Sequence, residues 1–162
     1  MLSISVKEFL IWKKKQLSKG GDQQSFAVLL DCVGGISISD LNLISINREG
    51  NLHLKQNLGF LESIWNEHLL KSCPIQYLCG ITFWRDLKLK VSKKVLIPRP
   101  ETELIIDIVC NLFRKKSQKL FFAELGTGSG AISIALALAY PFSDGVATDI
   151  DQDALEIATK NY

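Results

Sequence analysis

Three glycines at alternate positions stand near the end of the chain, within the segment FFAELGTGSGAISIALALA of residues 121–139. Gly126, Gly128 and Gly130 follow one apolar run and open a second run that has helical spacing. A strand that ends in such a turn places bare backbone N–H groups at the carboxyl edge of a parallel sheet, where α/β folds bind nucleotides. The turn therefore predicts a nucleotide-type ligand.

Two classes of ligand remain open for this turn. Gly126, Gly128 and Ala131 fit the G-x-G-x-x-G/A fingerprint of dinucleotide-binding proteins, and Asp149 follows about 20 residues later, where a ribose-binding acid belongs. Asp149 does not separate the classes, because every adenosine offers ribose hydroxyls to a carboxylate. The alternative to a dinucleotide is the methyl donor S-adenosylmethionine.

Glu124 favours the methyl donor. Its carboxylate lies two residues before Gly126, at the mouth of the predicted strand, where it would repel a pyrophosphate. S-adenosylmethionine has no phosphate, and its sulfonium and ammonium groups are cationic. We therefore expect S-adenosylmethionine as the cofactor.

The elements around the turn indicate a parallel sheet covered by helices. From Lys119 onward the pattern is strand, turn, helix, strand, helix, with the strands at 120–125 and 145–149 and the helices at 131–140 and 151–161. Both strands are apolar without alternation, which predicts a sheet buried on two faces.

A helix is predicted directly before this region, beginning at Pro100. Glu101 and Glu103 lie in its first turn, and the basic residues 114–116 are expected in its last turn, each sign matching the helix dipole. Its apolar residues fall on two neighbouring rows, Leu104, Ile108 and Leu112 on one and Ile105, Val109 and Phe113 on the next.

Upstream of this helix, a β-hairpin and a set of helices are predicted. Leu87, Leu89 and Val91 alternate with lysines, and residues 95–97 follow a turn-like Ser-Lys-Lys, which indicates the hairpin. Further upstream, Ser5 with Glu8 forms a capping box for a first helix that Gly20-Gly21 ends. Asp22 caps a second helix with an apolar face, ended by Gly34-Gly35, and helical segments follow near 39–46 and 57–71.

The predicted fold class is therefore α/β, with three parts along the chain. Residues 1–73 form a helical domain, residues 74–98 a hairpin linker, and residues 99–162 the sheet with its glycine turn. Only two strands and two helices follow residue 119, whereas open doubly wound sheets have about five strands or more. We therefore expect a fragment, from a truncated gene product, a split coding region or an incomplete record.

Composition excludes several classes of function. The 162 residues are 47% apolar and 22% charged with a net charge of +2, which is ordinary for a globular protein and too small to indicate nucleic-acid binding. The four cysteines and two histidines show no metal-ligand spacing, so no metal site is expected, and the cysteines read as reduced cytoplasmic thiols. The longest apolar stretch, 131–139, is too short for a membrane span, and the N-terminus does not read as a signal peptide.

Three stretches together resemble the release-factor glutamine methyltransferases, the HemK/PrmC family. They are PIQYLCGITFW at 74–84, VLIPRPETE at 95–103 and ELGTGSGAISIALA at 124–137. The resemblance implies methylation of a glutamine side-chain amide in peptide chain release factors, with S-adenosylmethionine as donor. It also implies a helical N-terminal domain that docks the substrate, a linking hairpin and a Rossmann-like methyltransferase sheet.

The resemblance extends to individual residues. It implies that the donor loop consists of Gly126, Thr127, Gly128, Ser129 and Gly130. It further implies that Asp149 holds the ribose hydroxyls, and Glu124 stands where most family members have aspartate. Arg99, Glu101 and Thr102 match the segment beside the active site, although with Pro100 they would serve equally well as a helix start.

One motif of the family is absent from these 162 residues. Asn-Pro-Pro-Tyr, which holds the poorly nucleophilic amide and aligns its nitrogen with the donor methyl, occurs nowhere in the chain. No catalytic residue can therefore be assigned, and we expect the fragment alone to be inactive. Two alternatives stay open, a non-catalytic module that binds release factors and a related methyltransferase acting on another protein or on RNA.

Overall fold

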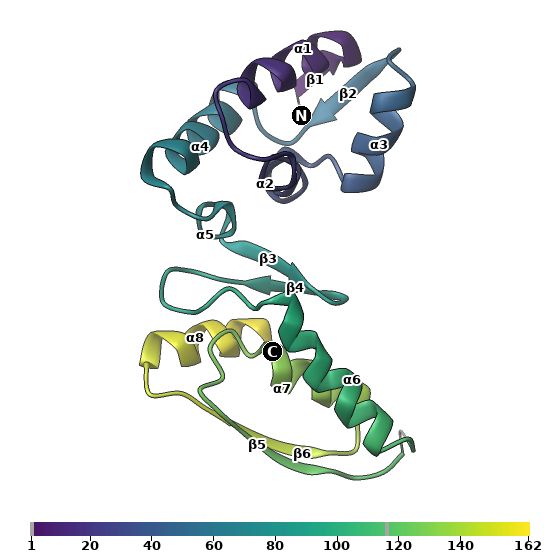
Figure 1. The fold of residues 1–162 in the computed structure, drawn as a ribbon, viewed down its shortest axis with the longest axis vertical. Coiled ribbons are helices and arrows are strands. Elements are labelled where there is room, and N and C mark those ends of the chain that lie inside the picture. The colour runs from purple at the N-terminus through teal and green to yellow at the C-terminus, as the bar shows by residue number, and fades with distance from the viewer. Residues whose placement is uncertain (1, 116) are drawn as a thin grey trace. The chain divides into compact units, whose positions relative to one another are not determined.

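The computed structural model describes residues 2–115 and 117–162, and the chain divides into two units, Met1–Cys79 and Gly80–Tyr162 (Figure 1). Each unit has helices and its own apolar core, with one two-stranded sheet described in the first unit and two in the second. The chain therefore has the mixed α/β composition that the sequence predicts.

The first unit consists mainly of helices, as predicted. They are α1 (Val6–Leu17), α2 (Gln23–Leu29), a π-helical turn (Leu30–Gly34), α3 (Ile38–Ile46), α4 (Leu58–Lys71) and α5 (Ile75–Cys79). The capping box of α1 is confirmed, because the Ser5 hydroxyl accepts from the Glu8 amide and the Glu8 carboxylate accepts from the Ser5 amide. Asp22 caps α2 by accepting a hydrogen bond from the Ser25 amide.

A two-stranded antiparallel sheet also belongs to the first unit, and the sequence did not indicate it. It pairs β1 (Leu2–Ser5) with β2 (Asn51–Leu54). Strands of four residues carry too little alternation to be recognised. The helices pack around aromatic side chains, where Phe26 and Trp65 meet edge to face at 4.8 Å between ring centroids.

The second unit contains the glycine turn. Its elements are β3 (Ile81–Trp84), β4 (Leu87–Lys90), a 3-10 turn (Pro100–Thr102), α6 (Glu103–Leu112), β5 (Phe121–Leu125), α7 (Ala131–Ala139), β6 (Asp144–Thr148) and α8 (Gln152–Asn161). β5 pairs with β6 in parallel, with Glu124 opposite Ala147. The predicted order of strand, turn, helix, strand and helix is confirmed.

The hairpin is present, but its predicted strand partners are wrong. β4 pairs with β3 through a two-residue turn at Arg85 and Asp86, where Arg85 has φ 50°, and residues 95–97 form no strand. The aromatic residues of β3 fit a strand better than the segment that ends before Pro98 does. The hairpin therefore lies between residues 81 and 90.

The prediction that the parallel pair is buried on both faces is wrong for the described residues. Side chains alternate along β5, where Phe122 and Glu124 are half-buried while Phe121, Ala123 and Leu125 are exposed. Figure 1 shows α6, α7 and α8 on the same side of the β5–β6 pair. A single layer of helices covers only one face of a sheet.

The inward face of α6 also differs from the predicted rows. Ile106 is its buried residue, and Val109 and Cys110 pack beside it, whereas Leu104 and Leu112 are 61% and 71% exposed. A narrow polar stripe leaves a wide apolar arc around the helix, so its periodicity did not show which part of that arc is buried.

The predicted basic last turn of α6 is wrong as well. The helix ends at Leu112, before Arg114 and Lys115, and Lys116 lies outside the described residues. The amide of Phe113, which donates to Val109 O at 2.9 Å, makes the last helical bond. Arg114 and Lys115 therefore follow the helix rather than belonging to its last turn.

The described part of the chain offers neither a single membrane-spanning helix nor a cluster of metal ligands. No single helix there has the length and apolar character needed to cross a membrane, although the helical pair Gln23–Gly34 and Ile38–Ile46, bent by 111°, meets these criteria together. Among the same residues, no group of three or more His, Cys, Asp or Glu side chains could hold a metal ion.

Candidate functional site

A hollow of about 150 Å³ brings most of the predicted site residues together. It lies where β5 ends and α7 begins, against the segment that precedes α6. Its lining consists of Leu96, Pro98, Arg99, Thr102, Glu124, Gly126, Thr127, Gly128, Ser129, Ala131 and Ile132. Three predicted residues, Glu101, Gly130 and Asp149, are not part of this lining.

The main-chain amides of the glycine turn are largely occupied by the protein itself. Those of Gly126 and Thr127 donate to the Thr148 carbonyl at 2.8 and 2.9 Å, and that of Gly130 donates to the Thr127 carbonyl at 2.9 Å. The amide of Gly128 donates to Asp149 Oδ2 at 2.8 Å. The expectation of bare N–H groups along the turn is therefore wrong for four of its five residues.

Gly126 and Gly128 need to be glycine for conformational reasons. Their φ values are 76° and 55°, in the left-handed region that L side chains rarely adopt. A Cβ added at either position would meet no heavy atom within 4 Å. The space in front of both residues is open, so a ligand can approach the backbone closely.

Asp149 connects the end of β6 to the turn. Its Oδ1 accepts from the Asp151 amide at 3.0 Å, and its Oδ2 accepts from the Gly128 amide. The Asp151 amide has the larger effect and the Gly128 amide the smaller, and both lower the pKa of Asp149 below its ordinary value. The side chain is therefore held as a carboxylate beside the turn without lining the hollow itself.

Glu124 is fixed by two hydroxyl side chains. Its Oε2 accepts a hydrogen bond from Thr127 Oγ1 at 2.8 Å and from the Ser133 amide at 3.1 Å. The Ser133 hydroxyl donates to the same oxygen. Ser133 was not among the predicted site residues, although a single polar residue in the apolar run of α7 is a signal that could have identified it.

The Arg99 segment is held through its backbone. Trp84 Nε1 donates to the Arg99 carbonyl at 2.9 Å, and the Thr102 amide donates to the same carbonyl at 3.0 Å. Arg99 itself is extended, as expected before a proline, and Pro100 begins the 3-10 turn. Arg99 and Thr102 line the hollow, whereas Glu101 is exposed.

Asn161 is a second residue that sequence reasoning missed. From the end of α8, its Nδ2 donates to the Ser129 carbonyl at 2.8 Å and to the Lys90 carbonyl at 3.0 Å. Its Oδ1 accepts from the Lys90 amide at 2.7 Å. One side chain thus joins the hairpin to the turn, and no local pattern around it predicts this role.

Comparison with known proteins gives the chain's relatives. No protein-family model matches it. A release factor glutamine methyltransferase of Prochlorococcus marinus is 43% identical over 158 residues, which are 97% of this chain and 54% of that protein. Proteins of the same name from Thermosynechococcus vestitus and Lactococcus lactis are 42% and 40% identical over 110 and 126 residues, covering 68% and 74% of this chain.

These relatives place the chain in a family of proteins named as methyltransferases. More particularly, the chain belongs to the release factor glutamine methyltransferase family. It spans about half the length of the curated relatives it matches, 54% of the Prochlorococcus protein and 52% of a Gloeobacter violaceus one.

Proposed function

We propose that the hollow beside the glycine turn binds S-adenosylmethionine as the methyl donor of a release factor glutamine methyltransferase with a Rossmann-like sheet. The observation that carries the proposal is the position of Glu124, whose carboxylate lines the hollow next to Gly126. The curated relatives support the same reading through their names.

The hydrogen bonding of the turn amides favours S-adenosylmethionine over a dinucleotide. A pyrophosphate is bound by free amide donors at a helix N-terminus and is repelled by a carboxylate beside them. Here Thr148, Asp149 and Thr127 already accept from four of the five turn amides. The cationic sulfonium and ammonium groups of S-adenosylmethionine need no such donors and are attracted by Glu124.

Two carboxylates beside the turn suit two different parts of the donor. Glu124 would face its cationic groups, and Asp149 would accept hydrogen bonds from its ribose hydroxyls. Ligand pockets commonly measure about 300 Å³ or more. The hollow holds about 150 Å³, so we expect the bound nucleoside to extend past it along the sheet edge, toward Asp149. When bound, S-adenosylmethionine supplies a methyl group that is electrophilic because its sulfur is positively charged.

Arg99 and Thr102 line the hollow and are the described residues placed to contact an incoming substrate. A glutamine amide must be oriented to act as a nucleophile, and the Asn-Pro-Pro-Tyr motif for that task does not occur in the 162 residues. We therefore propose that this chain, taken alone, binds the donor but does not transfer its methyl group.

Each part of the chain would have its own task. Residues 1–73 would dock a release factor, residues 74–98 would link, and residues 99–162 would form part of the methyltransferase domain. A cytoplasmic location belongs to the same proposal.

Ultraviolet cross-linking with methyl-labelled S-adenosylmethionine tests the donor site directly. Peptide mapping should find the label in peptides that contain residues 96–102 or 124–133. Excess unlabelled S-adenosylhomocysteine should suppress it. Label confined to other peptides would contradict the proposed site.

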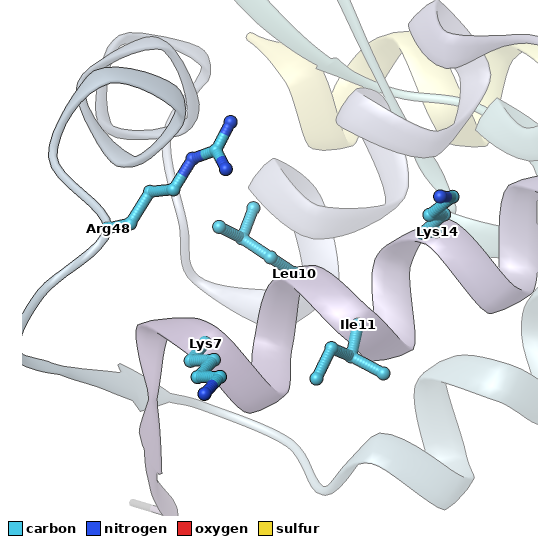
Figure 2. A pocket seen from close by; sticks show the side chains of 5 residues that line it. All are labelled: Lys7, Leu10, Ile11, Lys14 and Arg48. Atoms are coloured by element: carbon cyan, nitrogen blue, oxygen red, sulfur yellow. The ribbon is translucent and has the colours of Figure 1, made fainter.

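A second candidate function, a module that binds release factors without catalysis, is favoured by a hollow on the first unit. It measures about 360 Å³ and is lined by Lys7, Leu10, Ile11, Lys14 and Arg48. Figure 2 shows Arg48 reaching toward Leu10, whereas the other labelled side chains all come from α1. The mixture of cationic and apolar side chains suits an acidic segment that also carries apolar side chains.

A neighbouring hollow of about 460 Å³ extends this surface along α1. It shares Leu10 and Lys14 with the first hollow and adds Lys13, Leu17, Ser18 and Gln23. None of the described residues that line the two hollows is acidic. The combined surface therefore presents four cationic side chains beside apolar ones.

Titration of a purified release factor tests this surface. The double variant Lys7→Glu/Lys14→Glu should bind at least about tenfold more weakly than the parent chain, because charge reversal at a complementary surface is repulsive. Lys15→Glu/Lys93→Glu is the matched control, since it changes the net charge equally outside both hollows. Equal weakening by the two double variants would refute docking at this surface.

A further inference from the structure

Ser133 is a polar residue completely buried within an apolar helix. It lies on α7, whose other residues are alanine, isoleucine and leucine, and its exposed fraction is 0%. A buried hydroxyl requires a hydrogen-bond partner. The partner of Ser133 is the Glu124 carboxylate, which lies on β5 and lines the hollow.

Three donors converge on one oxygen of that carboxylate. Glu124 Oε2 accepts from the Ser133 hydroxyl, from the Ser133 amide at 3.1 Å and from Thr127 Oγ1 at 2.8 Å. Hydrogen bonds to an ionised group are stronger than neutral ones. Together they hold the glutamate side chain in one conformation and offset the rotamer entropy that is lost when it is ordered. Glu124 Oε1 takes part in none of these three bonds and remains for a ligand.

We propose that Ser133 is a positioning residue that sets the reach of Glu124 in the donor site. This inference rests on the proposed function. Glutamate is one methylene longer than the aspartate that the family resemblance leads us to expect at position 124. Ser133, in the first turn of α7, holds the far end of the longer side chain and directs its second oxygen at the cationic part of the donor. A preorganised carboxylate binds more tightly than a mobile one.

Ser133 and Glu124 are therefore energetically coupled in donor binding. Ser133→Ala removes one donor to Glu124, and Glu124→Asp draws the carboxylate back from Ser133. Once either change is made, the other has little left to remove. A double-mutant cycle on the affinity for S-adenosylmethionine should therefore be clearly non-additive.

Calorimetry with S-adenosylmethionine and S-adenosylhomocysteine supplies the test. Ser133→Ala should weaken the affinity for S-adenosylmethionine about tenfold and that for the uncharged thioether product less, since only the former carries the sulfonium charge. Glu124→Asp/Ser133→Ala should be no weaker than the weaker single variant. Thr159→Ala, which removes a hydroxyl bonded only within α8, is the control and should bind normally.

A second variant keeps the test informative if Ser133→Ala does not fold. Thr127→Val removes another donor to the same oxygen, this one from the turn itself. It should lower the ratio of the affinity for S-adenosylmethionine to that for S-adenosylhomocysteine. The inference is overturned if folded Ser133→Ala or Thr127→Val binds both nucleosides as the parent does. It is also overturned if the fold-change in affinity of the double variant equals the product of the two single fold-changes. Failure of the parent chain to bind either nucleoside would instead defeat the proposed function, and the inference with it.

Discussion

The main-chain amide of Gly128 donates a hydrogen bond of 2.8 Å to Oδ2 of Asp149. Gly128 lies in the turn after β5, and Asp149 directly follows β6, so this bond ties together the ends of two paired strands. A carboxylate has about four acceptor positions. Asp149 can therefore hold the turn in place and still accept ribose hydroxyls.

Asp149→Asn should weaken S-adenosylmethionine binding at least about tenfold, because it removes the charge and one acceptor from a group that serves both the turn and the ligand. Calorimetry measures the change. Asp144→Asn, at the opposite end of β6 and paired with Lys119, is the control and should bind normally. Equal affinity of Asp149→Asn and the parent would show that Asp149 does not hold the ribose.

The stability contributed by Asp149 should depend on pH in a defined direction. Native structure lowers the pKa of this carboxyl, since the amides of Asp151 and Gly128 donate to its charged form. The contribution is thus fully present above the ordinary value of about 3.9 and is lost as the pH falls through the lowered native pKa. The difference in unfolding midpoint between the parent and Asp149→Asn should shrink on acidification. A difference that grows toward acid pH would contradict this sign.

Gly126→Ala and Gly128→Ala should each destabilise the second unit by about 1–2 kcal/mol. The cause is backbone strain at positive φ. A steric clash is excluded, because a Cβ at either site meets no heavy atom within 4 Å. Urea unfolding measures the loss. Gly59→Ala, in α4 and without positive φ, should instead be neutral or stabilising by up to about 1 kcal/mol. Equal effects at all three sites would rule out the conformational explanation.

Local sequence patterns predicted the candidate site residues that lie at fixed spacings in the chain. The turn of residues 126–130, with Glu124 before it and Asp149 after it, follows from spacing that short-range rules describe. The occupation of the turn amides could not be predicted, because Thr148 reaches them only through the pairing of β6 with β5. Asn161 was missed for the same reason, since its partners Lys90 and Ser129 are brought to it by tertiary folding.

The fold shows the same division between local and long-range information. Caps at Ser5 and Asp22 were predicted, because each lies three residues from its partner. The buried face of α6 and the partner of β4 were not, because both depend on neighbours distant in sequence. A helix with a wide apolar arc and a short aromatic strand carry no local mark of what they pack against.

Asn161→Ala should destabilise the second unit by about 1–2 kcal/mol, because it removes three hydrogen bonds that join α8 to β4 and to the turn. Hydrogen exchange should show faster exchange of the Lys90 amide, which loses its acceptor. Thr159→Ala on the same helix loses only a bond to Leu155 and serves as the comparison. Unchanged exchange at Lys90 in Asn161→Ala would contradict the bridging role.

We propose that the turn after β5 binds a cationic, phosphate-free nucleoside. Calorimetry of the 162-residue chain with S-adenosylmethionine and, separately, with NAD distinguishes this ligand from a dinucleotide. We expect S-adenosylmethionine to bind measurably and more tightly than NAD, and Glu124→Gln to reduce that preference. Tighter binding of NAD than of S-adenosylmethionine would contradict the assignment of the site.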